Sequence, residues 1–125
     1  MALQTILIID DAAEHRDILS RLLRATGYDV FEVLPGPDAL ARAMQVQPDL
    51  ILANLSLPGQ PGWETVRQLR THAPLAHTPV LGTTVFTTLV PRWRVQSIGC
   101  TDCVDKPFDF DMVLSRVRGL LPLAA

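Results

Sequence analysis

The sequence predicts one α/β domain, in which five parallel strands form a sheet with helices on both faces. Short apolar, β-branched runs alternate with amphipathic stretches of helical period along all 125 residues, which is typical of a parallel sheet covered by helices. The chain is 48% hydrophobic and 19% charged, as in ordinary globular domains. No repeat, linker or low-complexity stretch interrupts the alternation, so we expect residues 1–125 to form a single domain.

The first strand and helix are marked by an apolar run and a glycine. Residues 5–10 are predicted to form a strand whose apolar middle suits burial on both sides. The helix predicted at 13–26 ends at Gly27, because glycine adopts the left-handed conformation common at helix C-termini. Spacing of three and four residues places its expected inner face on Ile18, Leu19, Leu22 and Ala25.

The other elements follow the same alternation. Further strands are predicted at 28–33, 50–54, 79–84 and 102–105. Further helices are predicted from about Gly36 to a point before Pro48, through Trp63, Val66 and Leu69, from Thr88 or Pro91 to Ile98, and over 109–121. The expected inner faces are Leu40, Ala43 and Met44, then Val95 and Ile98, then Phe110, Val113, Leu114 and Val117.

Charge and targeting signals exclude several functions. Eleven Lys and Arg against thirteen Asp and Glu give a net charge of -2, so nucleic acid and anionic membranes are not expected as main partners. The apolar run 6–9 ends at two aspartates and has neither a basic leader nor a cleavage site, unlike a signal peptide or a membrane span. We therefore expect a cytoplasmic protein with reduced cysteines.

Polar side chains stand where the predicted strands end. They are Asp10 and Asp11, Asn54, Thr83 and Thr84, and Asp105 with Lys106. Because the carboxyl ends of parallel strands open on one edge of the sheet, these residues should converge. Adjacent carboxylates with a nearby ammonium suit a hard cation and a phosphoryl group.

Together these motifs resemble the receiver domain of bacterial two-component response regulators, in particular the chemotaxis type, over essentially the whole chain. The motifs are Ile9-Asp10-Asp11, Pro48-Asp49-Leu50-Ile51-Leu52, Leu57-Pro58-Gly59 with Gly62, Thr84, and Asp105-Lys106-Pro107-Phe108. The resemblance implies a flavodoxin-like (βα)5 fold with strand order 2-1-3-4-5. It also implies a non-enzymatic signalling module in a phosphorelay.

The resemblance implies roles for the polar residues. Asp10 and Asp11 correspond to the acidic pair that binds Mg2+, and Thr84 and Lys106 to positions that engage the phosphoryl oxygens. The aspartate that accepts phosphate from a histidine kinase in this family is replaced by Asn54, and an amide cannot form the acyl phosphate. We therefore expect no phosphorylation at this position and weakened or absent Mg2+ binding, with the amide donating to Asp10 or Asp11 and Lys106 pairing with them.

Two more departures support loss of the usual switch. Val85 stands where the family has a small residue, and its branched side chain would narrow access to the site. Cys103 replaces the tyrosine or phenylalanine whose rotation reports phosphorylation in the family. Two alternatives remain: a phosphorylation-dependent regulator with another acceptor, of which Ser56 is the nearest hydroxyl, or a parent aspartate replaced by Asn54. A small enzyme or nucleotide binder is disfavoured because no glycine-rich loop follows the first strand.

A candidate contact surface lies on the predicted fourth helix. If Val95 and Ile98 face inward, Trp93 points nearly opposite, between Arg92 and Arg94. Exposed Trp and Arg are enriched at interface hot spots, although Trp93 lying flat on aliphatic stems is an equal alternative. In the receiver family the face of the fourth helix, fifth strand and fifth helix binds output partners and forms homodimers. We expect a protein partner, either a histidine kinase or a downstream signalling protein.

The remaining cysteines and histidines predict no site of their own. Cys100 and Cys103 form a CxxC spacing, but no second ligand pair exists for zinc and the spacing does not open a helix, so we expect two buried thiols. The histidines at 15, 72 and 77 lack metal-site spacing, and we expect them on the solvated surface.

Overall fold

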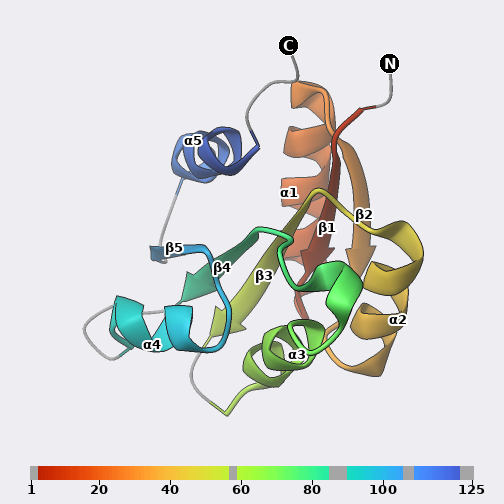
Figure 1. The fold of residues 1–125 in the computed structure, drawn as a ribbon. Coiled ribbons are helices and arrows are strands. Elements are labelled where there is room, and N and C mark those ends of the chain that lie inside the picture. The colour runs from red at the N-terminus through yellow and green to blue at the C-terminus, as the bar shows by residue number, and fades with distance from the viewer. Residues whose placement is uncertain (1–2, 57–58, 85–89, 106–108, 122–125) are drawn as a thin grey trace.

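The chain folds as alternating strands and helices (Figure 1). The computed structural model describes residues 3–56, 59–84, 90–105 and 109–121, without the side chains of Ser56 and Asp105. The strands are β1 (Thr5–Ile9), β2 (Asp29–Val33), β3 (Leu50–Ser56), β4 (Val80–Thr84) and β5 (Asp102–Asp105). The helices are α1 (Ala13–Thr26), α2 (Pro37–Val46), α3 (Pro61–Leu69), α4 (Arg92–Ser97), α5 (Phe110–Leu120) and the short 3-10 helix η1 (Ala73–Leu75).

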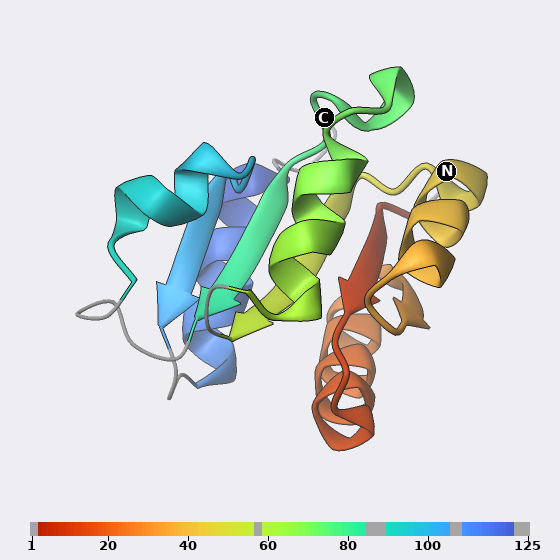
Figure 2. The same ribbon diagram turned by 90° about the horizontal axis from the view of Figure 1, so that it is seen from below.

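All five strands are parallel and lie in the order β2-β1-β3-β4-β5, which confirms the predicted fold class. Helices cover both faces, with α1 and α5 on one side and α2, α3 and α4 on the other (Figure 2). Each face has its own core, and residues 6–9 of β1 are buried from both sides. No helix in the described part of the chain is long and apolar enough to cross a bilayer.

Local sequence signals explain where several helices begin and end. Gly27 ends α1 with a φ of 111°, in the left-handed region that glycine tolerates best. Pro37 opens α2 in the first turn, where its missing N–H costs no helical hydrogen bond. The Asp109 side chain caps α5 by accepting a 2.9 Å hydrogen bond from the backbone N–H of Met112. These boundaries lie within a residue or two of the predicted ones.

The prediction for the inner face of α1 was right for Leu19 and wrong for its other three residues. Ile18 and Leu22 are 56% and 37% exposed, and Ala25 is also exposed, whereas Leu19 and Leu23 are buried against α5 and the sheet. Both stripes have helical spacing, so periodicity alone does not choose between them. Packing against β1, β2 and α5 selects the Leu19 stripe and leaves the other on the surface.

Other inner faces follow the predictions. Val95 and Ile98 of α4 and Val113 and Val117 of α5 are buried, with Phe110 and Leu114 packed beside the latter. Two differences in length stand out: β3 continues to Ser56, and α4 is confined to Arg92–Ser97. The 3-10 helix η1 was not predicted.

Arg70, directly after α3, contacts the two segments that precede β4 and β5. Its Nε and Nη2 donate to the Gly99 carbonyl at 2.8 and 2.6 Å. Its Nη1 donates to the carbonyls of Leu75, Ala76 and Thr78 at 2.9, 3.3 and 2.6 Å. The planar guanidinium thus satisfies several carbonyl groups in these loops.

Candidate functional site

The carboxyl ends of β1 and β3 bring two carboxylates and an amide together. Asn54 Nδ2 donates to Asp10 Oδ1 at 3.1 Å and reaches Asp11 Oδ1 at 3.5 Å. Strands β1 and β3 pair directly, with Ile9 opposite Ala53, so the residues that follow lie side by side. The structure therefore contains the amide-to-carboxylate contact that the sequence predicted for Asn54.

Asp10 is the more constrained of the two carboxylates. It is 4% exposed, and its Oδ1 also accepts a 2.9 Å hydrogen bond from the Ala12 backbone N–H. The Arg16 guanidinium donates to the Asp10 carbonyl at 2.6 Å. Asp11 is exposed. A buried carboxylate needs such donors to offset its desolvation, so Asp10 is held in place while Asp11 faces solvent.

His15 joins this cluster, which the sequence analysis missed. Its Nδ1 lies 3.6 Å from Asp10 Oδ2, and its side chain remains half exposed. The expectation of a solvated histidine is thus met only in part. The available signal was its place in the first turn of α1, because a helix that follows β1 begins at the same sheet edge as the acidic pair.

Strand β4 contributes hydroxyl groups to the same edge. Thr83 Oγ1 donates to Asn54 Oδ1 at 3.4 Å, and both Thr83 and Thr84 are buried. The pairing of β3 with β4 shifts register between Asn54 and Ser56. Bulges of this kind re-aim side chains and are common beside functional sites.

Gly62 lets α3 begin directly over the end of β3. A Cβ atom at this position would lie 2.2 Å from the Asn54 carbonyl oxygen, well inside van der Waals contact. The backbone of the α3 first turn therefore packs against the same residue whose side chain faces Asp10 and Asp11.

Asp10 and Asp11 are the residues at this edge that would hold a Mg2+ ion. Two carboxylates completed by water are a normal ligand set for Mg2+. Asn54 instead directs its N–H donors at both carboxylates. Within the described residues, no group of three or more His, Cys, Asp or Glu side chains could hold a metal ion.

Several predicted site residues are not placed by the structure. Val85 and Lys106 lie outside the described residues, and so does the expected pairing of Lys106 with the acidic residues. Ser56 lies in β3, but its side chain is also outside the description. Cys103 is buried in the core between the sheet and α3 and α4.

The CxxC cysteines are both buried, as predicted. Burial raises the pKa of the Cys100 thiol to about 12, while the nearby Arg70 partly opposes that shift. A thiol with so high a pKa carries little thiolate at neutral pH. This favours packing over redox chemistry for Cys100.

Asp102 links the three elements of the face formed by α4, β5 and α5. This β5 carboxylate pairs with Arg92 of α4 and, at 3.0 Å, with Arg116 of α5. Trp93 is 68% exposed, as the helical geometry predicted, and Met112 of α5 is also exposed. Arg94 instead lies over the ring of Trp63, 6.0 Å from its centroid. Arg92 and Arg94 thus contact other side chains of the protein, whereas the indole of Trp93 is largely exposed.

The strand order and the acidic pair at the end of β1 define a doubly wound α/β domain with its site at the carboxyl edge of the sheet. Residues 6–118 match the sequence model of the response regulator receiver domain. The chain belongs to this family, the receiver domains of two-component signalling systems.

Known proteins with similar sequences and structures agree with this assignment. The chain is 39% identical over 116 residues to the DNA-binding dual master transcriptional regulator RpaA of Synechocystis sp., covering 93% of this chain and 48% of that protein. The chain thus spans about half the length of that relative.

The chemotaxis response regulator CheY4 of Vibrio cholerae has a TM-score of 0.86 and 28% identity, covering 96% of this chain and all of that one. A receiver domain of a Pseudomonas aeruginosa sensor histidine kinase has a TM-score of 0.83 and 25% identity, covering 95% and 98% of the two chains. It is described with a magnesium ion coordinated in its active site cleft.

Proposed function

We propose that this receiver domain accepts no phosphoryl group at its third strand and signals through protein contacts. The observation that carries the proposal is Asn54, an amide at the end of β3 whose Nδ2 donates to Asp10 and Asp11. Aspartyl phosphate forms when a carboxylate oxygen attacks phosphorus, and a neutral amide lacks that nucleophile. Asn54 stands, in this proposal, at the position of the phosphoacceptor.

Weakened Mg2+ binding follows from the same residue. An aspartate at position 54 would add a negative charge beside Asp10 and Asp11, and at an effective dielectric constant of about 20 its attraction for a nearby cation is at most a few kcal/mol per unit charge. The amide removes that attraction and supplies hydrogen-bond donors to the two carboxylates instead. The edge is thus stabilised without a cation.

We assign the remaining family positions by the same reasoning. Asp10 and Asp11 are the acidic pair, Thr84 the switch hydroxyl and Lys106 the lysine that pairs with phosphoryl oxygens in relatives. Cys103 replaces the bulky aromatic residue, so a rotation of that side chain cannot report phosphorylation. These residues then serve to hold the sheet edge in one arrangement, and the module catalyses no reaction.

The contact surface is the face of α4, β5 and α5, with Trp93 at its centre. Its exposed indole and the Arg92–Asp102–Arg116 network combine an aromatic anchor with charged neighbours, the combination enriched at interface hot spots. The partner is a histidine kinase, a downstream signalling protein or a second copy of this chain, in the cytoplasm. Neither nucleic acid nor membrane is a direct partner.

The proposal is tested by exposing the protein to Mg2+ and a small acyl-phosphate donor and measuring the intact mass. We expect no phosphoryl adduct on the unaltered protein. The matched variant Asn54→Asp restores a carboxylate with almost the same shape, and it should gain one phosphoryl group in a Mg2+-dependent manner.

Two results would contradict the proposal. A phosphoryl adduct on the unaltered protein would show that the protein can accept phosphate in a phosphorelay. Peptide mapping would then show whether Ser56 or another residue carries the phosphoryl group. Failure of a folded Asn54→Asp variant to accept phosphate would overturn the assignment of position 54.

A further inference from the structure

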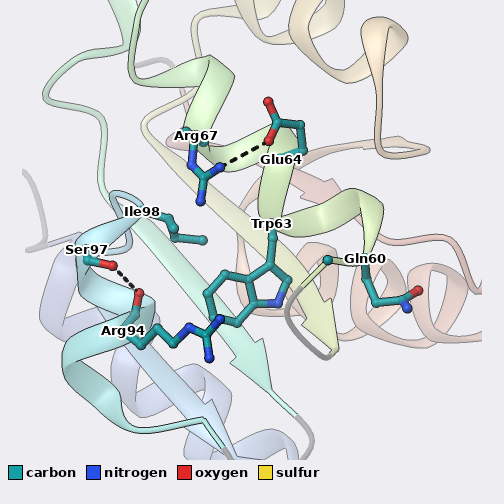
Figure 3. Close-up of a pocket in the computed structure, with 8 residues that line it drawn as sticks. Gln60, Trp63, Glu64, Arg67, Arg94, Ser97 and Ile98 are labelled. Atoms are coloured by element: carbon teal, nitrogen blue, oxygen red, sulfur yellow. Dashed lines mark hydrogen bonds and ion pairs between the residues drawn. The ribbon is translucent and has the colours of Figure 1, made fainter.

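A hollow of about 190 Å³ opens between α3 and α4 (Figure 3). Its walls include Trp63, Glu64 and Arg67 on one side and Arg94, Ser97 and Ile98 on the other. Pockets for drug-sized ligands are commonly about 300–1,000 Å³, so this hollow suits a group about as large as one side chain. Its lining contains none of the residues placed at the carboxyl edge of the sheet.

The surroundings of the hollow favour a negatively charged occupant. Although the whole chain has a net charge of -2, no Asp or Glu occurs from residue 65 to residue 101. The Arg94 guanidinium has no carboxylate within ion-pair distance among the described residues. Among the described residues, Arg67 pairs only with Glu64, which also lines the hollow, at 3.4 Å and with both side chains mostly exposed. Exposed pairs of this kind contribute little, so Arg67 remains available to a ligand.

The wall between the two arginines is the buried indole of Trp63, which is 4% exposed. Figure 3 shows the guanidinium groups of Arg67 and Arg94 on two sides of this ring. The Trp63 Nε1 is buried without a hydrogen-bond partner in the described structure. The ring of Trp63 contacts the Arg94 guanidinium in a cation–π interaction, which holds Arg94 at the hollow. Because the indole is buried, it offers no free face on which a nucleobase could stack.

We propose that this hollow binds a carboxylate side chain from an acidic segment of a partner protein. Arginine forms bidentate hydrogen bonds with carboxylates, and two guanidinium groups at the walls provide donors from opposite sides. A lone carboxylate at a solvent-facing arginine binds weakly. A segment with several acidic residues adds attraction to the other arginines of residues 65–101, a stretch without Asp or Glu. This site does not depend on whether Asn54 can be phosphorylated, and Trp93 is not part of its lining.

The test is an NMR titration of the full chain with a blocked oligoglutamate peptide, with oligoglutamine of equal length as the neutral control. The two indole N–H signals of the protein are assigned with a Trp93→Phe variant. We expect a saturable shift of the Trp63 signal with oligoglutamate, a smaller change at Trp93, and no saturable shift with oligoglutamine.

Charge variants distinguish this site from general attraction. Arg94→Gln should weaken binding about tenfold, because it removes a charged hydrogen-bond donor from the wall. Arg67→Gln should weaken binding by a smaller factor. The matched control Arg92→Gln removes the same charge from the same helix but leaves the lining intact, so its effect should be less than about twofold.

Three outcomes would overturn the proposal. The first is equal weakening by Arg94→Gln and Arg92→Gln, which would indicate non-specific charge attraction. The second is a Trp63 signal that does not saturate with oligoglutamate. The third is an equal response to inorganic phosphate, which would show that the hollow takes simple anions and not an acidic peptide segment.

Discussion

The two edges of the sheet hold their polar groups in different ways. At the carboxyl edge, the side chains of Asp10, Asn54 and Thr83 contact one another at 3.1 to 3.4 Å. At the amino edge, Arg70 donates to backbone carbonyls, and its bonds to Gly99 and Thr78 are as short as 2.6 Å. The carboxyl edge is held by contacts between side chains, whereas at the amino edge one side chain joins the backbone of two segments.

The two edges should therefore respond differently to substitution of their polar residues. A hydrogen bond between two side chains can be changed by substituting either residue, and the backbone of the surrounding loops then stays in place. A guanidinium that satisfies several partly buried carbonyls leaves all of them without this donor when it is lost. The carboxyl edge should therefore tolerate substitution that the amino edge does not.

Arg70→Met should have the largest effect on stability. It keeps much of the apolar stem but leaves the carbonyls of Gly99, Leu75 and Thr78 without their donor, at a cost of about 2–4 kcal/mol in the free energy of unfolding. Urea denaturation followed by circular dichroism measures this loss. Arg70→Lys retains the charge without the planar fork and should recover only part of it.

The matched change at the other edge is Asn54→Ala, which should cost less than about 1 kcal/mol because its hydrogen bonds are long. An equal loss in Asn54→Ala and Arg70→Met would remove the distinction between the two edges.

Gly62→Ala should have the next largest effect and would show where the carboxyl edge is rigid. The added methyl group would meet the Asn54 carbonyl oxygen, so α3 must shift, at a cost of about 1–3 kcal/mol. The control is Gly119→Ala in α5, where nothing lies within 4 Å of the added atom. That change should stabilise the protein by about 0.5–1 kcal/mol through helix propensity. Thermal unfolding of both variants measures the contrast, and a neutral Gly62→Ala would contradict the close packing.

Alkaline pH should act on the amino edge through Cys100, with an effect that appears only above about pH 9.0. Burial raises the pKa of this thiol to about 12 from an ordinary value of 9.0. Between these values the unfolded chain loses the proton while the folded protein keeps it, so stability is complete below pH 9.0 and falls as pH rises. Ionisation of Cys100 in the unfolded chain lowers the free energy of unfolding by at most about 1.4 kcal/mol per pH unit. Urea midpoints across this range should fall less steeply for Cys100→Ala, and identical slopes would exclude the thiol as the cause.

Much of the fold could be predicted because its signals are local. The apolar run 6–9, Gly27 and the proline at position 37 set elements by their own chemistry, and the structure has them where predicted. The inner face of α1 could not be predicted, because two rows of residues have the same helical spacing, one beginning at Leu19 and the other at Ile18. Only packing against α5 and the sheet decides between them.

The candidate site was predictable to the extent that it consists of strand ends. Asp10, Asp11 and Asn54 meet because parallel strands end on one edge, and that rule needs no side-chain detail. The partners of Arg70 could not be predicted, because backbone carbonyls carry no residue-specific signal. The hollow beside Trp63 depends on how far α3 lies from α4, a distance that the spacing of residues within either helix does not encode.

The strand order also bears on how the molecule assembles. After β3 has paired with β1, each later strand adds at the same growing edge in the order of synthesis, since β4 pairs with β3 and β5 with β4. Nothing must be threaded between strands already paired. A chain emerging from the ribosome can therefore extend its sheet strand by strand, and the contact of Thr83 with Asn54 forms only when β4 arrives.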